Sequence, residues 1–247
     1  MSEIIKTEAI VLSKMNYGDT STIATLFTDD LGKISVLIKG ARSPKSKYGR
    51  IVDPINHLLV VLYKKESRDI QLLSGADIID HYPEIKNDLN KLKYAYSITE
   101  LVKNLLAEHE INKRIFKGLV KILNRLNRGE EPSEVTFGRF FLFFLKEIGY
   151  EIQIESCSVC GKKTISTDYF YSFEKGLMCG ECKKSAVDIY DINLELLGYL
   201  KCLNSDESIS SFDNLICQRA IIFMENHLKY HVSDFKGISS LRLFNER

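Results

Sequence analysis

The chain has 247 residues, which is enough for one large domain or two modest ones. Its 34 Lys and Arg residues against 33 Asp and Glu give a net charge of +1, so bulk charge cannot hold a nucleic acid and any such site must be a local patch. The 45% hydrophobic content, with 4 Pro and 14 Gly, excludes collagen-like and low-complexity chains.

The start of the chain carries charged residues and lacks the apolar core of an export signal. Its longest run of aromatic and aliphatic residues, Phe140 to Leu145, is far shorter than the roughly 20 residues of a membrane span. We therefore expect a cytoplasmic protein without membrane contact, whose six cysteines are reduced unless a metal holds them.

Residues 1–80 carry the signals of short strands separated by turns. The third strand shows the clearest alternation, because Ile34, Val36 and Ile38 alternate with other residues at a period of two. The fourth is apolar on both faces, so we expect it to be covered on both sides. Together the five expected strands form a small antiparallel barrel or sandwich. Besides the third strand, they are Glu8–Lys14, Thr20–Thr28, His57–Tyr63 and Asp69–Ser74.

After residue 80 the apolar period becomes helical. The expected helices comprise a stripe from Leu89 to Leu106, then Ile111–Arg128, a helix from Pro132 to Gly149, and finally Asp191–Leu203 and Leu215–His231. Composition divides the chain into a strand-rich domain at 1–80, a first helical part at 81–150, a cysteine-containing insert at 151–184 and a second helical part at 185–247. The fold class is therefore multidomain α+β.

Four cysteines have the spacing of a zinc site: Cys157, Cys160, Cys179 and Cys182. Two residues between thiolates let one tight turn present both sulfurs to an ion, and a second such turn completes a tetrahedron. A closed set of four thiolates has no open position, which predicts one structural Zn²⁺. Gly161 suits the positive φ of such a turn, and 168–173 is an expected strand of the ribbon. The alternatives are redox disulfides or thiols without metal.

The remaining cysteines, Cys202 and Cys217, fall within apolar helical patterns and are expected in the core. His227 and His231 are four residues apart and share a helix face, but no third ligand stands near them in the sequence, so we expect no metal there.

The first of two basic clusters contains no acidic residue from Leu31 to Val52. Glycine, serine and proline predict a mobile loop in its middle, which can follow a phosphate backbone while one tyrosine stacks on bases. The alternative is a solvated loop that only protects a sheet edge. The candidate DNA-binding residues are Lys33, Lys39, Arg42, Lys45, Lys47, Tyr48 and Arg50.

The second cluster lies on the predicted helix Ile111–Arg128, which contains no acid. At about 100° per residue its six cations fall within an arc of roughly 120°. Such a stripe fits a second stretch of phosphate backbone or an acidic peptide of a partner, and the alternative is an ordinary solvated face. These cations are Lys113, Arg114, Lys117, Lys121, Arg125 and Arg128.

The sequence contains none of the common catalytic motifs: no Walker A sequence, no G-x-G-x-x-G, no HExxH and no G-x-S-x-G. We therefore expect a protein that is not an enzyme, although an uncharacterised enzyme that uses the barrel as a platform stays open.

Several short pieces of the strand-rich domain are distinctive: Glu8-Ala9-Ile10-Val11-Leu12, Tyr17-Gly18-Asp19-Thr20-Ser21, Phe27-Thr28, Gly32-Lys33, Lys39-Gly40-Ala41-Arg42 and Arg68-Asp69. Together these pieces resemble the RecO family of bacterial recombination mediators. The order of parts also resembles that family over the whole chain: strands, helices, a four-Cys insert and more helices.

The resemblance implies an N-terminal five-stranded OB-fold barrel and a helical domain with an inserted zinc-binding segment. It also implies a DNA repair function: binding of single- and double-stranded DNA, annealing of complementary strands and, with RecR, loading of RecA onto DNA coated by single-strand binding protein. The implied partners include the acidic, apolar C-terminal tail of that binding protein, contacted by the helical domain. The four cysteines carry over directly, whereas individual DNA and tail contacts do not.

Annealing requires neutralised phosphates and exposed base edges, which a cationic loop provides. If six phosphates on single-stranded DNA are neutralised, we expect a log–log salt slope of roughly −4. The alternative function is a zinc-containing adaptor that grips other proteins without binding DNA.

Overall fold

The computed structural model describes residues 3–163, 169–185, 189–205 and 213–243. Their contacts form two compact units: residues 1–128 with 239–247, called here the barrel unit, and residues 129–238, called the cysteine unit. The helical residues up to 128 thus pack with the barrel, a grouping that composition alone does not indicate.

Five strands close into a barrel in the order β1-β2-β3-β5-β4, which confirms the expected five-stranded barrel. Every neighbouring pair is antiparallel except β3 and β5, which pair in parallel over three residues. A bulge in β1 between Val11 and Ser13 bends this long strand so that it pairs with both β2 and β4. The strands are β1 (Glu3–Tyr17), β2 (Ser21–Thr28), β3 (Gly32–Ile38), β4 (His57–Lys64) and β5 (Ile70–Asp80).

Alternate residues of each strand fill the barrel interior, as a period of two requires. In β4 the buried residues are Leu58, Val60 and Leu62. The outer face of this strand is only partly covered, and Tyr63 is exposed. The expectation that β4 is covered on both sides is therefore wrong, because no element of the described residues lies over the outer side chain of Tyr63 closely enough to bury it.

The helices of the barrel unit are α1 (Tyr48–Ile51), α2 (Pro83–Lys86), α3 (Leu89–Leu105), α4 (Lys113–Arg128) and α8 (Ser239–Leu243). The Asp88 side chain starts α3 by accepting hydrogen bonds from two backbone N–H groups of its first turn. The buried face of α3 includes Tyr94, Ile98 and Val102. Leu89, placed in the apolar stripe by the sequence, lies exposed in the first turn.

The segment between α3 and α4 packs against the turn between β2 and β3. Gly32 has φ +68°, and a Cβ there would lie 2.2 Å from the Glu110 carbonyl oxygen, so only glycine fits. The His109 N–H donates to the Lys33 carbonyl at 2.9 Å. The ring of Phe116 in α4 packs against the ring of Phe27. These contacts place the start of α4 at the β2–β3 turn.

The cysteine unit contains α5 (Ser133–Glu147), α6 (Leu194–Asn204) and α7 (Asn214–His231), with a sheet of order β7-β6-β8. Its strands are β6 (Tyr169–Ser172), β7 (Gly176–Cys179) and β8 (Tyr190–Asp191), and a 3₁₀ helix covers Gly180–Ser185. The ribbon strand expected at 168–173 is thus confirmed over β6, and residue 168 lies outside the described residues.

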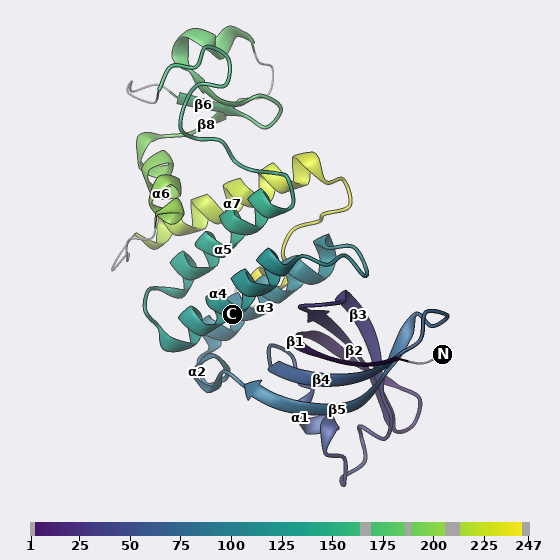
Figure 1. Cartoon of the computed structure of the whole chain (residues 1–247). Helices are drawn as coiled ribbons and strands as arrows, with labels where there is room; N and C mark the ends of the chain where they lie inside the picture. Colours follow the sequence, from purple (N-terminus) through teal and green to yellow (C-terminus); the bar gives the residue numbers. More distant parts are fainter. Residues whose placement is uncertain (1–2, 164–168, 186–188, 206–212, 244–247) are drawn as a thin grey trace. The chain divides into compact units, whose positions relative to one another are not determined.

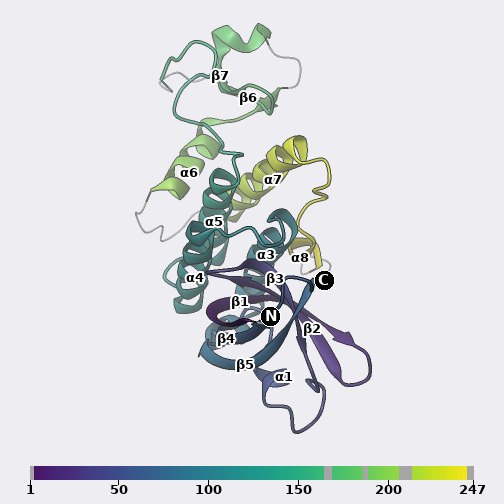
Figure 2. The ribbon, with the colours of Figure 1, turned by 45° about the vertical axis from the view of Figure 1, so that its right-hand side comes forward.

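The apolar run from Phe140 to Leu145 spans more than one turn of α5, and the helix is therefore buried on most of its faces, where it packs against α6 and α7 (Figure 2). Gly138 lies in close contact with α6, because a Cβ there would lie 3.0 Å from a methyl group of Leu203. Among the residues that the structure describes, no helix combines the length and the apolar character that a membrane crossing requires.

Candidate nucleic-acid interface and metal centre

The segment 39–50, called here the cationic loop, follows β3, includes most of α1 and presents five exposed cations (Figure 1). No carboxylate of the described residues forms an ion pair with any of them. The loop therefore keeps its positive charge available at the surface. The five cations are Lys39, Arg42, Lys45, Lys47 and Arg50.

One end of the cationic loop is fixed to the hairpin between β1 and β2. The Arg42 backbone N–H donates to the Thr20 carbonyl at 2.9 Å. Its guanidinium Nη1 donates to the Gly18 carbonyl at 3.1 Å. The first turn of the loop is thus held on the barrel by two hydrogen bonds to backbone oxygens.

The other end is fixed by packing around α1. A Cβ on Gly49 would lie 1.9 Å from the Ala41 carbonyl oxygen, so the two ends of the loop touch each other. Tyr48 packs against the barrel core beside Ala41. The predicted mobile loop is therefore held by internal contacts, and the half-buried ring of Tyr48 packs in part on the barrel core, with the Lys47 ammonium 5.7 Å from the centre of the ring.

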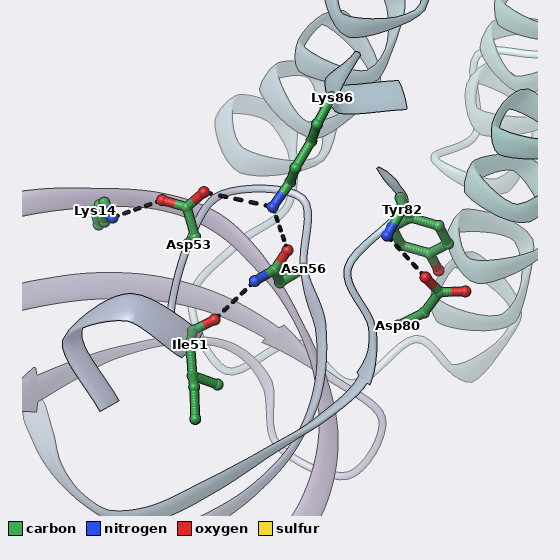
Figure 3. Close-up of polar contacts among 7 residues, drawn as sticks. All are labelled: Lys14, Ile51, Asp53, Asn56, Asp80, Tyr82 and Lys86. Atoms are coloured by element: carbon green, nitrogen blue, oxygen red, sulfur yellow. Dashed lines mark hydrogen bonds and ion pairs between the residues drawn. The ribbon is translucent and has the colours of Figure 1, made fainter. Parts of the chain in front are cut away.

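A network just beyond α1 keeps the nearest acid away from the cationic loop (Figure 3). Asp53 pairs with Lys14 at 2.6 Å and with Lys86 at 3.4 Å. The Lys86 ammonium also donates to the Asn56 side-chain oxygen at 2.5 Å, and the Asn56 amide donates to the Ile51 carbonyl at 2.8 Å. The negative charge of Asp53 is thus satisfied by lysines outside the loop. To the right of the network in Figure 3, the Asp80 carboxylate accepts a hydrogen bond from the N–H of Tyr82, where the chain turns into α2.

Lys33 does not belong to this surface, which corrects its place among the candidate DNA-binding residues. Its side chain is buried, and the ammonium donates to the Lys103 carbonyl at 2.7 Å. It also pairs with Glu108 at 3.3 Å. Lys103 lies in the last turn of α3 and Glu108 in the segment that follows this helix, so both partners stand about 70 residues or more along the chain and the local sequence does not indicate the pairing.

The basic stripe on α4 is partly neutralised at its first residue. Lys113 pairs with Asp30 at 2.9 Å and Asp29 at 3.6 Å, both in the β2–β3 turn. The hydrogen bond from Lys113 lowers the pKa of Asp30, and the same bond raises the pKa of Lys113. Lys117 and Lys121 are exposed. Three arginines of the stripe also make interactions within the protein: Arg114, Arg125 and Arg128.

The two basic clusters lie toward opposite ends of β2. The cationic loop contacts the β1–β2 hairpin, whereas α4 begins at the β2–β3 turn. These ends are separated by the length of β2, Ser21–Thr28, which is roughly 23 Å at about 3.3 Å per residue step. Arg42 and Lys113, the residues that fix the two clusters to the barrel, are therefore separated by the length of this strand.

The four cysteines that the sequence paired come together in the cysteine unit. The sulfurs of Cys157, Cys160, Cys179 and Cys182 all lie within 4.8 Å of one another. Cys160 Sγ and Cys179 Sγ are 3.7 Å apart, close to the roughly 3.8 Å edge of a tetrahedron with metal–sulfur distances of about 2.3 Å. Gly161 has the expected positive φ of +73° in the first turn. The four thiols are thus positioned to bind a metal ion.

The backbone around the cluster favours a thiolate. Although burial acts to raise the pKa of the Cys157 thiol, hydrogen bonds from the backbone N–H groups of Cys160, Cys179 and Val159 lower it to about 6. Burial and the neighbouring thiols raise the pKa of Cys182 to about 12. Without a cation, four thiolates in contact repel each other, so a dication at their centre fits this donor set.

Among the described residues, the other cysteines and the histidines do not belong to a group of three or more side chains that could hold a metal ion. Cys217 is buried in α7, as expected, whereas Cys202 is exposed, so its placement in the core is wrong. The Cys202 side chain lies on the solvent side of α6, next to the buried Leu203. His227 is buried, with Nδ1 3.3 Å from the Tyr171 hydroxyl and Nε2 3.1 Å from the Tyr150 carbonyl oxygen. His227 is therefore a hydrogen-bonded core residue.

Comparison with known proteins gives one consistent result. A family model described as "Recombination protein O N terminal" matches residues 1–82, and one described as "Recombination protein O C terminal" matches residues 86–236. A DNA repair protein RecO of Geobacter metallireducens is 33% identical over 198 residues, which are 79% of this chain and 80% of the relative.

Two further relatives bear the same name. The protein of Alkaliphilus metalliredigens is 30% identical over 194 residues, 78% of this chain and 77% of its own length. That of Chloroherpeton thalassium is 26% identical over 259 aligned positions, 98% of each chain. The similarity thus extends over both units.

Proposed function

The chain belongs to the RecO family of DNA repair proteins, and from this premise we propose that it binds and anneals single-stranded DNA through the cationic loop of its barrel. In this role it also binds double-stranded DNA and, together with RecR, helps to load RecA onto DNA coated by single-strand binding protein. The role is that of a mediator without catalysis of its own, in the cytoplasm and at the nucleoid when on DNA.

The observation that carries the proposal is the availability of charge on the cationic loop. Five cations are exposed without a carboxylate partner among the described residues, and the closest acid in the sequence, Asp53, is paired with Lys14 and Lys86. Both ends of the loop are anchored, so little ordering is needed when a strand binds.

Such a loop suits annealing. Lysine and arginine contacts to phosphates lower the repulsion between two strands and leave the Watson–Crick edges of the bases exposed. With Lys33 excluded, five phosphate contacts on single-stranded DNA correspond to a salt slope of roughly −3.5.

The four-cysteine set supports a structural zinc ion. Thiolate donors select Zn²⁺ among the common metals with tetrahedral geometry, and a set of four protein ligands has no position for a substrate. In this proposal the ion holds the turn at Cys157–Cys160 against the end of β7 and takes no part in DNA chemistry.

The α4 stripe supports contact with a protein. Lys117 and Lys121 are exposed on α4, a helix whose first residue, Lys113, lies at the β2–β3 turn and not at the hairpin that the cationic loop contacts. The acidic, apolar C-terminal tail of single-strand binding protein has the charge to pair with this stripe. RecR is a further partner of the same proposal.

The decisive experiment reverses two charges of the loop. The Lys45→Glu/Lys47→Glu variant should lose at least tenfold in affinity for an oligonucleotide at low salt, and its salt slope should flatten, because two phosphate contacts become repulsive. Annealing of complementary strands should slow in parallel.

A matched control changes the same charge elsewhere on the barrel. The Lys65→Glu/Arg68→Glu variant alters two exposed cations of the β4–β5 turn, outside the cationic loop, and should keep DNA affinity within about twofold of the parent in the same buffer. Equal losses in both variants, or no DNA binding by the parent, would favour the rival function of a zinc-containing adaptor that contacts only proteins.

A further inference from the structure

The hairpin between β1 and β2 carries an exposed aromatic ring beside the cationic loop. Tyr17 is the last residue of β1 and is 53% exposed, and Met15, two residues earlier, is 63% exposed. Large apolar side chains at this exposure are common singly, but here two of them stand next to each other on one face.

The strand register places these two side chains on the outer face of the barrel. Met15 lies opposite Ile23 and Tyr17 opposite Ser21, whereas the alternate β2 residues Thr22 and Ala24 are buried. Ile23 in turn lies opposite Leu37 of β3, and Lys39 directly follows the last residue of that strand. The outer surface of three strands therefore runs from Tyr17 and Met15 to the first cation of the loop.

Hydrogen bonds hold the ring and the cations together. Arg42 donates from its guanidinium to the Gly18 carbonyl and from its backbone N–H to the Thr20 carbonyl. Gly18, with φ +57°, directly follows Tyr17, so the turn that ends β1 is the turn that the loop contacts. The position of Tyr17 relative to the cationic loop is thus fixed by the fold of the barrel unit.

The charges around the hairpin indicate how a strand would lie. Asp19 is exposed at the tip of the hairpin and repels phosphate, whereas the cationic loop attracts it. A strand whose phosphates lie along the loop and whose bases lie over the hairpin places its negative charge near the cations and away from Asp19. An aromatic face and a polarizable thioether beside it suit bases of any sequence, because every base has a π-face.

We propose that Tyr17, with Met15 beside it, is the platform on which the bases of single-stranded DNA stack while the cationic loop holds the phosphates. The platform takes the role that the sequence assigned to Tyr48, whose ring packs on the barrel core. This inference rests on the proposed function of the loop. It predicts tighter binding of single strands than of duplex DNA, because the bases of a duplex stack on each other and do not present their faces to a protein.

The test compares two probes with the full-length chain: an oligothymidylate and an abasic strand of equal length, which has the same phosphates and no bases. The Tyr17→Ala variant should bind the oligothymidylate roughly five- to 150-fold more weakly, with an unchanged salt slope, and the abasic strand as the parent does. Tyr17→Phe should restore binding, since stacking needs the ring and not the hydroxyl. Tyr63→Ala removes another exposed ring of the barrel and should change neither affinity.

A second measurement does not depend on removing the ring. The chain contains no tryptophan, so Tyr17→Trp introduces a single indole whose fluorescence should be quenched by the oligothymidylate and not by the abasic strand. Equal binding of both probes by the parent, equal losses of Tyr17→Ala on both, or an indole that ignores the bases would each overturn the platform and leave the cationic loop as a phosphate site. Failure of the parent to bind either probe would overturn the proposed function as well.

Discussion

The barrel unit leaves its most important charges at the surface, whereas the cysteine unit buries polar groups and satisfies them inside. In the barrel unit the five cations of the cationic loop are exposed and without carboxylate partners among the described residues. In the cysteine unit four thiols meet around one point, and Arg139 is buried with Glu131 at 3.1 Å. Charge at a surface is available to a ligand, while a buried polar group acts on stability.

This difference predicts that substitutions in the two units affect different measurements. Changes of exposed cations in the barrel unit should alter DNA affinity and leave the unfolding transition in place. Changes of the buried polar groups in the cysteine unit should alter stability, because each leaves a partner desolvated.

The largest effect is expected at the cysteine cluster. Cys179→Ser removes one of four ligands, so the content of zinc by elemental analysis should fall from one ion per chain to near zero, and residues around the cluster should become sensitive to protease. Apparent binding energies of structural zinc are about 10–16 kcal/mol in small peptides, so the module should not keep its fold without metal.

Cys202→Ser is the matched control, because Cys202 is an exposed thiol outside the cluster. It should retain the metal and the protease resistance of the parent. An undiminished metal content in Cys179→Ser, or a protein that is equally stable after chelation, would contradict a structural zinc site.

The next effect is expected at the buried ion pair. Arg139 donates to Glu131 and to the carbonyls of Cys202, Leu203 and Ser205 at the end of α6. Arg139→Met leaves the Glu131 charge buried without this partner and should lower the free energy of unfolding by about 3–5 kcal/mol in urea titrations. The double variant Glu131→Leu/Arg139→Met should recover part of that loss. A double variant as unstable as Arg139→Met would show that the unpaired charge of Glu131 does not cause the loss of stability.

A pH dependence of stability should come from His227. Burial, and then the nearby His231, lowers the pKa of His227 to about 4. The unfolded chain, with a pKa near 6.5, therefore binds a proton that the folded chain does not bind between these pH values. Stability should be full above about pH 6.5 and fall as the pH drops toward 4, by about 3 kcal/mol in total.

The measurement is the difference between the parent and His227→Gln, because the difference removes the titration of other groups. Urea midpoints at pH 7.5 and pH 4.5 should show a steeper decline for the parent. Parallel declines in the two proteins would assign the acid sensitivity to groups other than His227.

The sequence predicted those features that depend on neighbouring residues. The alternation of Ile34, Val36 and Ile38 follows from one face of β3 filling the barrel. Each C-x-x-C pair contains the turn geometry of a metal site within four residues, so the cysteine cluster was predictable. The fold class of barrel, helices and cysteine insert was predictable as well.

What the sequence missed depends on contacts between distant residues. Lys113 looked unpaired on an acid-free helix, but Asp30, 83 positions earlier, lies at its ammonium. Tyr48 stood among the cations and was predicted to stack, although its ring covers the barrel core. The exposed Tyr17 ends a strand just before a Gly-containing turn, which is the one local signal that pointed to a ring at the hairpin tip.

The smallest and most discriminating effect is expected for two lysines that the sequence placed in one cluster. Lys33→Met removes a buried donor from the Lys103 carbonyl and should cost about 1–2 kcal/mol of stability, with DNA affinity and salt slope unchanged. Lys39→Met should do the reverse: the unfolding midpoint stays in place, while the slope of log affinity against log salt becomes less negative by about 0.7, the contribution of one phosphate on single-stranded DNA. Because both variants lose one charge, net charge cannot explain a difference between them. An equal loss of DNA affinity in the two variants would contradict the view that only the exposed lysine contacts the phosphates.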